Sequence, residues 1–142
     1  YKNKLSEAIN TGFSILQDNG SSLDAVEATI KILENSDLFN AGKGSVLSYD
    51  GVVEMDASIM DGNNLNAGAV TGIKTIKNPI SAARLVMEKS DHVLLSGKGA
   101  ESFALTNGLE FIDNDYFITE KRLNLLNKAK KKEGFTIKQP GN

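Results

Sequence analysis

The periodicity of the apolar residues changes once along this 142-residue chain, and that change constrains the fold more than any other feature. Up to Glu34 the apolar residues recur with the period of a helix. Over residues 52–59 they alternate, which makes one face of a strand apolar and the other polar. The glycine-containing stretch FNAGKGSV, residues 39–46, joins the two regions. Helices followed by strands and then by βα elements are typical of the α+β class.

Two helices are expected before residue 35. The first covers residues 1–17 and ends at Asn19 and Gly20, a pair typical of a left-handed helix end. Ser21, followed three residues later by Asp24, has the spacing of a capping box and starts the second helix. So short a turn predicts that the helices pack as an antiparallel hairpin. Their apolar stripes are formed by Leu5, Ala8, Ile9, Phe13 and Leu16, and by Leu23, Val26, Ile30 and Leu33.

The strand region begins with a predicted β-hairpin over residues 45–59, which turns at Asp50 and Gly51. A third strand, NAGAVTGI, covers residues 66–73, and its small side chains predict that another element packs closely against it. A short buried strand is expected at residues 93–95. In the hairpin, alternation places Val53, Met55, Ala57 and Ile59 on one face, and Glu54, Asp56 and Ser58 on the other.

Three further helices are predicted. Asn78 caps the first of them, with Pro79 at the first helical position. Residues 100–105 form a short helix, and Thr119 caps the last one. The side chains expected to face inward are Ile80, Ala83 and Met87 in the first helix and Leu123 and Leu126 in the last.

A sheet of only three or four strands leaves unpaired edges, which proteins normally avoid. We therefore expect more polypeptide to complete this α+β unit, so that residues 1–142 are one portion of a single domain.

The amino-acid composition excludes several kinds of functional site and binding partner. The chain has no Cys, which excludes disulfides, a thiolate nucleophile and Cys-ligated zinc. A net charge of −2 gives no general attraction to nucleic acid or to a membrane surface, and no apolar run has the length of a membrane span. No signal peptide is visible, which favours a cytoplasmic location; the chain starts at Tyr1 without Met, so an upstream segment is expected.

A search for a nucleophile finds little. There is a single His, His92, at a predicted strand start, where a boundary residue bonded to backbone is the favoured interpretation over catalysis. Glu54 and Asp56 share one strand face and Asp61 follows in the next turn, a pattern that a Mg²⁺ or Ca²⁺ site would need. Alternation predicts a solvated polar face there in any case, with Asp56 and Asp61 as acceptors that pin loops.

Two further stretches, one rich in glycine and one in lysine, are better explained by local structure than by ligand binding. SGKGAES, residues 96–102, lacks the spacing of a phosphate-binding loop, and a tight strand-to-helix turn is favoured. KAKKK, residues 128–132, suits a solvated helix end and has no aromatic neighbours of the kind that nucleic-acid sites use.

Four motifs, in order and at consistent spacing, resemble the isoaspartyl peptidase/plant-type L-asparaginase family, whose members are N-terminal-nucleophile hydrolases. The resemblance runs from Leu5 to about Gly134. The motifs are LFNAGKGSV, EMDASIMDG, NAGAVTGIKTIKNPISAARLVME and HVLLSGKGAESFA.

The resemblance implies a four-layer αββα sandwich made from one precursor that cuts itself into α and β subunits. This chain would be the α subunit, completed by the β subunit and assembled as an (αβ)₂ heterotetramer. The nucleophilic Thr would begin the β subunit after a Gly-Thr cut beyond Asn142, and its free α-amine would act as the base. The implied activity is hydrolysis of isoaspartyl dipeptides and L-asparagine, without a catalytic cofactor.

The resemblance also assigns residues. Asn40 matches a supporting Asn that sits beside the Thr and positions it. The loop matches one that holds a sodium or potassium ion through main-chain carbonyls, so the Glu34 side chain is expected to have no part in binding and Glu34→Gln to matter little. The implied carbonyl ligands are those of Leu33, Glu34, Ser36, Phe39, Ala41 and Lys43.

Two alternatives stay open. Glycosylasparaginase is a relative that shares MDG and the IKN helix start, but it usually lacks the run found here at residues 39–46. A non-catalytic family member would act as a binding or scaffold domain. A Gly-Thr junction after the α subunit would favour an enzyme over the scaffold.

Overall fold

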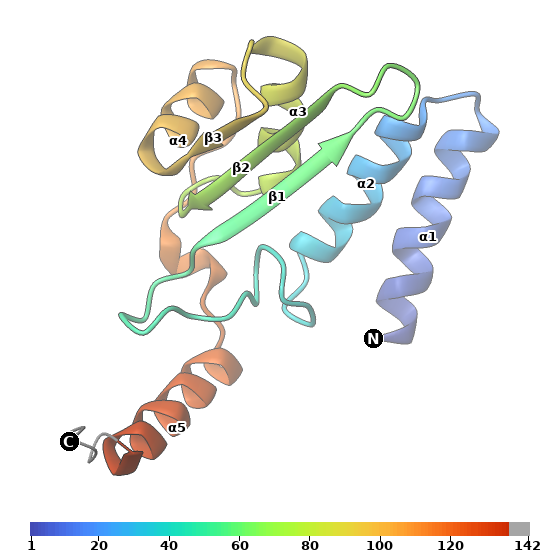
Figure 1. Ribbon diagram of the computed structural model, residues 1–142. Coiled ribbons are helices and arrows are strands. Elements are labelled where there is room, and N and C mark those ends of the chain that lie inside the picture. Colours follow the sequence, from blue (N-terminus) through green and yellow to red (C-terminus); the bar gives the residue numbers. More distant parts are fainter. Residues whose placement is uncertain (137–142) are drawn as a thin grey trace.

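A three-stranded sheet with helices on one of its faces organises the chain (Figure 1). The computed structural model describes residues 1–136. The strand order is β1-β2-β3, with β1 and β2 antiparallel and β2 and β3 parallel. In chain order the elements are α1 (Lys2–Gln17), α2 (Ser22–Glu34), β1 (Met55–Met60), β2 (Ala67–Ile73), α3 (Pro79–Lys89), β3 (Leu94–Ser96), α4 (Gly97–Thr106), the 3-10 helix η1 (Asn114–Phe117) and α5 (Glu120–Thr136). No helix in this described part is long and apolar enough to cross a bilayer.

The two-helix start is confirmed. Asn19 adopts a left-handed conformation at the end of α1, with a φ of 62°. The hydroxyl of Ser21 accepts a hydrogen bond from the Asp24 N–H at 3.1 Å and donates one to the Asp24 carboxylate at 2.7 Å. The helices α1 and α2 lie side by side, with Ala8 and Gly12 of α1 buried between them.

The core lies between the sheet and the helices α3 and α4. The small side chains of β2 allow this packing, as expected: a Cβ on Gly68 would overlap the Ala83 carbonyl and the Met87 N–H of α3. The alternation of β1 is confirmed as well. The buried apolar residues of the core are Val53, Met55, Ile59, Val70, Ile73, Ile76, Ile80, Ala82, Ala83, Val86, Ala100, Ala104 and Phe117.

The other face of the sheet is open. Ser58, Ala69 and Leu94 form a row across the three strands on this face, and Leu94 is 55% exposed. The predicted burial of residues 93–95 is therefore wrong for Val93 and Leu94, because β3 is an edge strand and only Leu95 reaches the core. Within the described residues β1 is the opposite edge, so the expected open edges are confirmed.

The predicted β-hairpin over residues 45–59 forms only in part. A turn closes between Ser48 and Gly51, but a single bridge, Leu47 with Val53, replaces the first strand. Side-chain amides bond the backbone of both segments. Asn114 bonds both the N–H and the C=O of Val53, at 3.0 and 2.9 Å, and Asn40 accepts from the Val46 N–H at 2.8 Å.

The last helix differs from expectation too. Thr119 caps it through the Arg122 N–H at 3.3 Å, as predicted. However, α5 projects from the body (Figure 1), so Leu123 is 43% exposed and does not face inward, while Leu126 is half-buried.

A buried carboxylate begins α3. Asn78 occupies the N-cap position, but its side chain does not cap the helix. Instead the Glu34 carboxylate, at the end of α2, accepts from the Ile80 N–H at 2.9 Å and from the Asn78 amide at 3.0 Å. Glu34 is 3% exposed, and this burial raises its pKa to about 7 despite the two hydrogen bonds. The Glu34 side chain thus has a structural role at the start of α3, in addition to the main-chain role that the resemblance assigns to this residue.

The raised pKa of Glu34 predicts a loss of stability with rising pH. The folded state keeps the proton up to about pH 7, whereas the unfolded chain releases it near its ordinary pKa of 4.5. This contribution to the free energy of unfolding should be largest below pH 4.5, fall by roughly 3 kcal/mol up to pH 7, and stay level above. Glu34→Gln should abolish that fall, because an amide does not titrate.

Urea unfolding of the complete gene product at pH 5 and pH 8 measures the difference. Choline buffers keep alkali cations away from the neighbouring loop. Glu110→Gln is the matched control, since Glu110 is exposed and pairs with Lys77 at the surface, at 3.1 Å. An unchanged pH dependence in Glu34→Gln would contradict the burial argument.

Candidate functional site

A polar pocket of about 330 Å³ lies between the loop that follows α2 and the start of β1. The loop contributes Asn40 and Ser45, Glu54 and Asp56 come from just before and within β1, and the end of α2 and the start of α3 also line the pocket. The lining residues are Glu34, Asn40, Ala41, Gly42, Ser45, Val46, Glu54, Met55, Asp56 and Pro79.

Two glycines shape the loop. Gly42 and Gly44 have positive φ values of 54° and 93°, a region that L side chains rarely adopt. A side chain at either position would also overlap backbone, that of Glu34 for Gly42 and that of Asp37 for Gly44. The Lys43 N–H donates to the Glu34 carbonyl at 2.7 Å, so the loop closes on the end of α2.

Asn40 presents its amide to the pocket from this loop. Its Oδ1 accepts from the Val46 N–H at 2.8 Å, which is the role expected of a turn residue. The residue is exposed, and within residues 1–136 its Nδ2 group makes no hydrogen bond. One end of the amide is thus fixed by the loop while its two N–H donors are available to a group that enters the pocket.

The carboxylates at the rim are held by the sheet. The Asp56 Oδ1 accepts from the Thr71 hydroxyl at 2.6 Å and from the Gly72 N–H at 2.8 Å, and these bonds hold the pKa of Asp56 below its ordinary value. Glu54 pairs with Lys74 at 2.7 Å. Both side chains are exposed, and because Lys74 compensates Glu54, Asp56 is the carboxylate that gives the rim its negative charge.

Asp61 does not join them. Its carboxylate accepts from the Asn63 N–H at 2.9 Å in the turn after β1, so Asp56 and Asp61 pin loops as predicted. In the described residues, no group of three or more His, Cys, Asp or Glu side chains is arranged to hold a metal ion.

The six residues assigned to a cation by resemblance all lie in or next to the closed loop. The Leu33 carbonyl accepts from the Ser36 N–H at 3.1 Å, and Ser36 is buried. The ring of Phe39 packs edge-on against Tyr1 at 5.5 Å, and the Lys43 ammonium lies over the Tyr116 ring. The side chains of Phe39 and Lys43 thus engage neighbouring rings, and neutral backbone carbonyls are the donor type that a hard cation accepts. Ala41 also lines the pocket.

The remaining candidates stay outside the pocket. His92 is exposed, and its backbone bonds the Ser90 hydroxyl, which fits the boundary interpretation. The SGKGAES stretch is a strand-to-helix turn, as predicted, with a φ of 49° at Gly97. In KAKKK, Lys130 lies 4.6 Å from the centre of the Tyr49 ring, and Lys128 and Lys131 are exposed.

Sequence reasoning missed three side chains that build the site: Glu34, Asn114 and Arg122. Each bonds backbone more than 40 positions away in the chain, at Ile80, Val53 and Gly44 respectively. Periodicity gives no signal for such contacts. Only Glu34 has a feature in the sequence that could have drawn attention to it. It is an acidic residue at the end of an apolar helical stripe, shortly before a loop that contains two glycines.

Comparison with known proteins agrees with the motifs. Residues 1–141 match a family model described as asparaginase. The plant-type L-asparaginase of Thermococcus kodakarensis is 56% identical over 126 residues, which are 89% of this chain and 40% of that protein. A probable isoaspartyl peptidase/L-asparaginase of Arabidopsis thaliana is 50% identical over 129 residues, 91% of this chain and 40% of that protein.

The isoaspartyl peptidase of Escherichia coli is 45% identical over 137 residues, 96% of this chain and 42% of that protein. The chain therefore spans about two fifths of the length of the curated relatives that it matches. The order of the motifs, the identities and the match over residues 1–141 place this chain in the isoaspartyl peptidase/plant-type L-asparaginase family.

Proposed function

We propose that this chain is the α part of an autoproteolytic threonine amidohydrolase that cleaves β-aspartyl dipeptides and L-asparagine. The names of its relatives, isoaspartyl peptidase and L-asparaginase, support the reaction and both substrate types. Since the chain spans about two fifths of those relatives, the nucleophile and the groups that grip the substrate belong to the remaining portion, the β subunit.

The observation that carries the proposal is the pocket beside Asn40. It offers two free amide donors and a negative rim, but the residues that line it include no His, Cys or Lys that could activate a nucleophile. A Thr whose own α-amine is the base needs no such partner. Asn40 would donate a hydrogen bond that orients the amine or hydroxyl of this Thr toward the substrate carbonyl.

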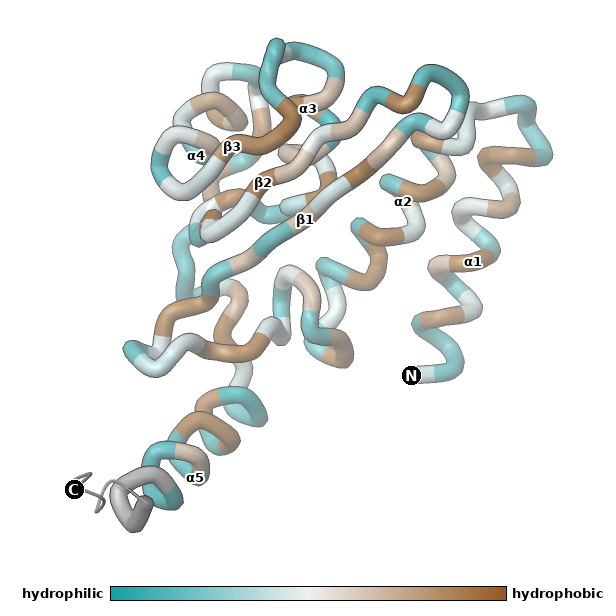
Figure 2. The backbone as a smooth tube through the Cα atoms, in the orientation of Figure 1, coloured by the Kyte–Doolittle hydropathy of each residue, from teal (hydrophilic) through white to brown (hydrophobic). Residues whose placement is uncertain are grey.

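The fold supports a second portion that extends the sheet. The groove between α1 and α2 has a volume of about 400 Å³ and an almost wholly apolar lining. Its α2 wall includes Ile30, which also packs against the core, so the groove is continuous with the hydrophobic interior. In Figure 1, α1 lies beyond the free edge of β1, with no strand beside it, and Figure 2 shows the apolar positions recurring along it. The lining residues are Ile9, Gly12, Phe13, Leu16, Ala25, Val26, Thr29 and Ile30.

The β subunit would therefore pair with the free edge of β1, cover this groove and place a second sheet on the open face near Leu94. That arrangement gives the four-layer αββα sandwich, and two such units would form the (αβ)₂ heterotetramer. The rival glycosylasparaginase usually lacks the run at residues 39–46 that forms the wall of the pocket.

We also propose a structural sodium or potassium ion in the loop, held by the carbonyls of the six residues assigned above. The closed loop fits such an ion, because a carbonyl that accepts one hydrogen bond still has a second lone pair. The ion would hold the loop in shape and take no part in the chemistry.

The intact mass of the complete gene product tests the mechanism. Two fragments are expected, the second beginning with Thr, together with release of aspartate from a β-aspartyl dipeptide and from L-asparagine. A single uncut chain without turnover would contradict the proposal and favour the scaffold alternative.

Asn40→Asp separates a functional amide from a turn residue. The carboxylate keeps an oxygen for the Val46 N–H, so the loop should fold, but it removes both free donors. Cleavage or turnover should fall by roughly 10²-fold, as for the loss of one positioned hydrogen bond. Cleavage and turnover rates within a few-fold of wild type would show that Asn40 is only a turn residue.

The cation should stabilise the protein by mass action. The melting temperature should rise with sodium or potassium chloride relative to choline chloride at the same ionic strength. Equal melting temperatures in the three salts would count against the ion.

Phe13→Asp tests the covered groove. Phe13 is 57% exposed here, and a charge beneath the second portion should lower the yield of its complex with this chain at least about tenfold. Ser14→Asp adds the same charge to the neighbouring exposed position, which does not line the groove, and should leave assembly intact. Equal yields of the β subunit in pull-downs with the two variants would show that the β subunit does not cover the groove.

A further inference from the structure

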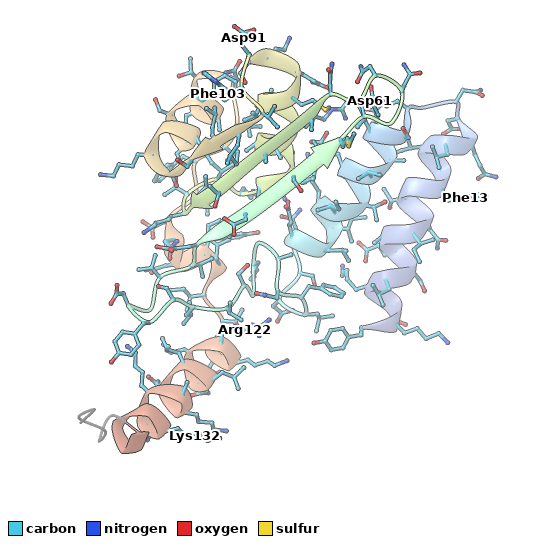
Figure 3. The ribbon with its side chains drawn as sticks, in the orientation of Figure 1. Phe13, Asp61, Asp91, Phe103, Arg122 and Lys132 are labelled. Carbon is cyan, nitrogen blue, oxygen red and sulfur yellow. The ribbon has the colours of Figure 1, made fainter. Side chains whose placement is uncertain are left out.

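Arg122 binds the pocket loop from the first turn of α5. Its Nε donates to the Gly44 carbonyl at 2.6 Å (Figure 3 shows Arg122 between α5 and this loop). The side chain is half-buried, and it makes no ion pair with the side chains of residues 1–132. The charged guanidinium therefore donates to a backbone carbonyl. A hydrogen bond from a charged donor is stronger than one from a neutral donor.

Gly44 is held on both sides by the same segment. Its N–H donates to the carbonyl of Phe117 at 2.9 Å, and its own carbonyl accepts from Arg122. Phe117 is fully buried in the core, so this anchor is rigid. With a φ of 93° and backbone of Asp37 where a side chain would lie, Gly44 has little room to move.

Two residues further on, the loop reaches the candidate catalytic amide. The N–H of Val46 fixes the Oδ1 of Asn40 at 2.8 Å. Val46 and Arg122 also line one small cavity of about 200 Å³, together with Leu125 and Leu126 of α5. The direction in which Asn40 presents its Nδ2 donors therefore depends on where Gly44 and Val46 are held.

We propose that Arg122 is a positioning residue: by fixing the Gly44 carbonyl it holds Val46, and through Val46 the Asn40 amide, in the geometry that the reaction uses. The proposal rests on the function proposed above for Asn40. Arg122 would touch neither substrate nor nucleophile. The alternative is that the contact only attaches α5 to the body of the protein.

A double-mutant cycle in the complete gene product separates these roles. The variants are Arg122→Met, which removes the donor, Arg122→Lys, which keeps a cation, and Asn40→Ala, alone and combined with Arg122→Met. Lys121→Met is the matched control, because Lys121 is the neighbouring exposed cation of α5.

Arg122→Met should lower kcat by tenfold to about 10²-fold with little change in KM, as expected when a catalytic group is misplaced. Arg122→Lys should restore part of the rate, and Lys121→Met should leave it unchanged. In the Asn40→Ala background Arg122→Met should cost less than about twofold more, because its effect passes through Asn40. An equal loss in both backgrounds, or wild-type kcat in Arg122→Met, would overturn the proposal.

Hydrogen exchange gives a readout independent of catalysis. Arg122→Met should speed exchange of the Val46 and Gly44 amides at least tenfold, and Lys121→Met should not. Faster exchange in a gene product without hydrolase activity would refute the proposed function, and with it the catalytic part of this proposal, and would leave only a structural role for Arg122 in holding the loop. Unchanged exchange with normal turnover would refute the positioning role alone.

Discussion

The buried carboxylate of Glu34 is the contact on which the rest of the structure depends. It joins the end of α2 to the start of α3, while the carbonyl of the same residue closes the pocket loop through Lys43. One residue thus sets the distance between the helical hairpin, the helix that covers the sheet and the loop that carries Asn40. Its buried position raises the pKa of the carboxyl to about 7, so the contact costs stability when the group ionises.

The pocket is built by backbone shape more than by charged side chains. Glycines with positive φ allow the loop to fold back on α2, and donors from distant segments then fix it in place. Arg122 and Phe117 hold Gly44 from one side, and Val46 holds Asn40 from the other. A site of this kind can orient a group that enters from outside without supplying a nucleophile of its own.

The sheet and the helical hairpin also leave apolar surface exposed. Helices cover one face of the sheet, but Leu94 is exposed on the other, and an apolar groove lies open between α1 and α2. Both features are unfavourable in water for a chain alone. They are consistent with a family in which the matched relatives are somewhat more than twice as long as this chain.

The local elements and the family could be predicted from the order of the residues alone. Capping at Ser21, the left-handed Asn19, the alternation of β1 and the small residues of β2 are nearest-neighbour or periodic features, and all are found in the structure. Asn40 could be singled out because four motifs occur in order. The tertiary structure decided the rest. Residues 45–49 are not a strand: a single bridge joins Leu47 to Val53, and the Asn40 side chain takes the Val46 N–H that a longer ladder would use. The roles of Glu34 and Arg122 depend on partners that only folding brings near, and no local period records such contacts.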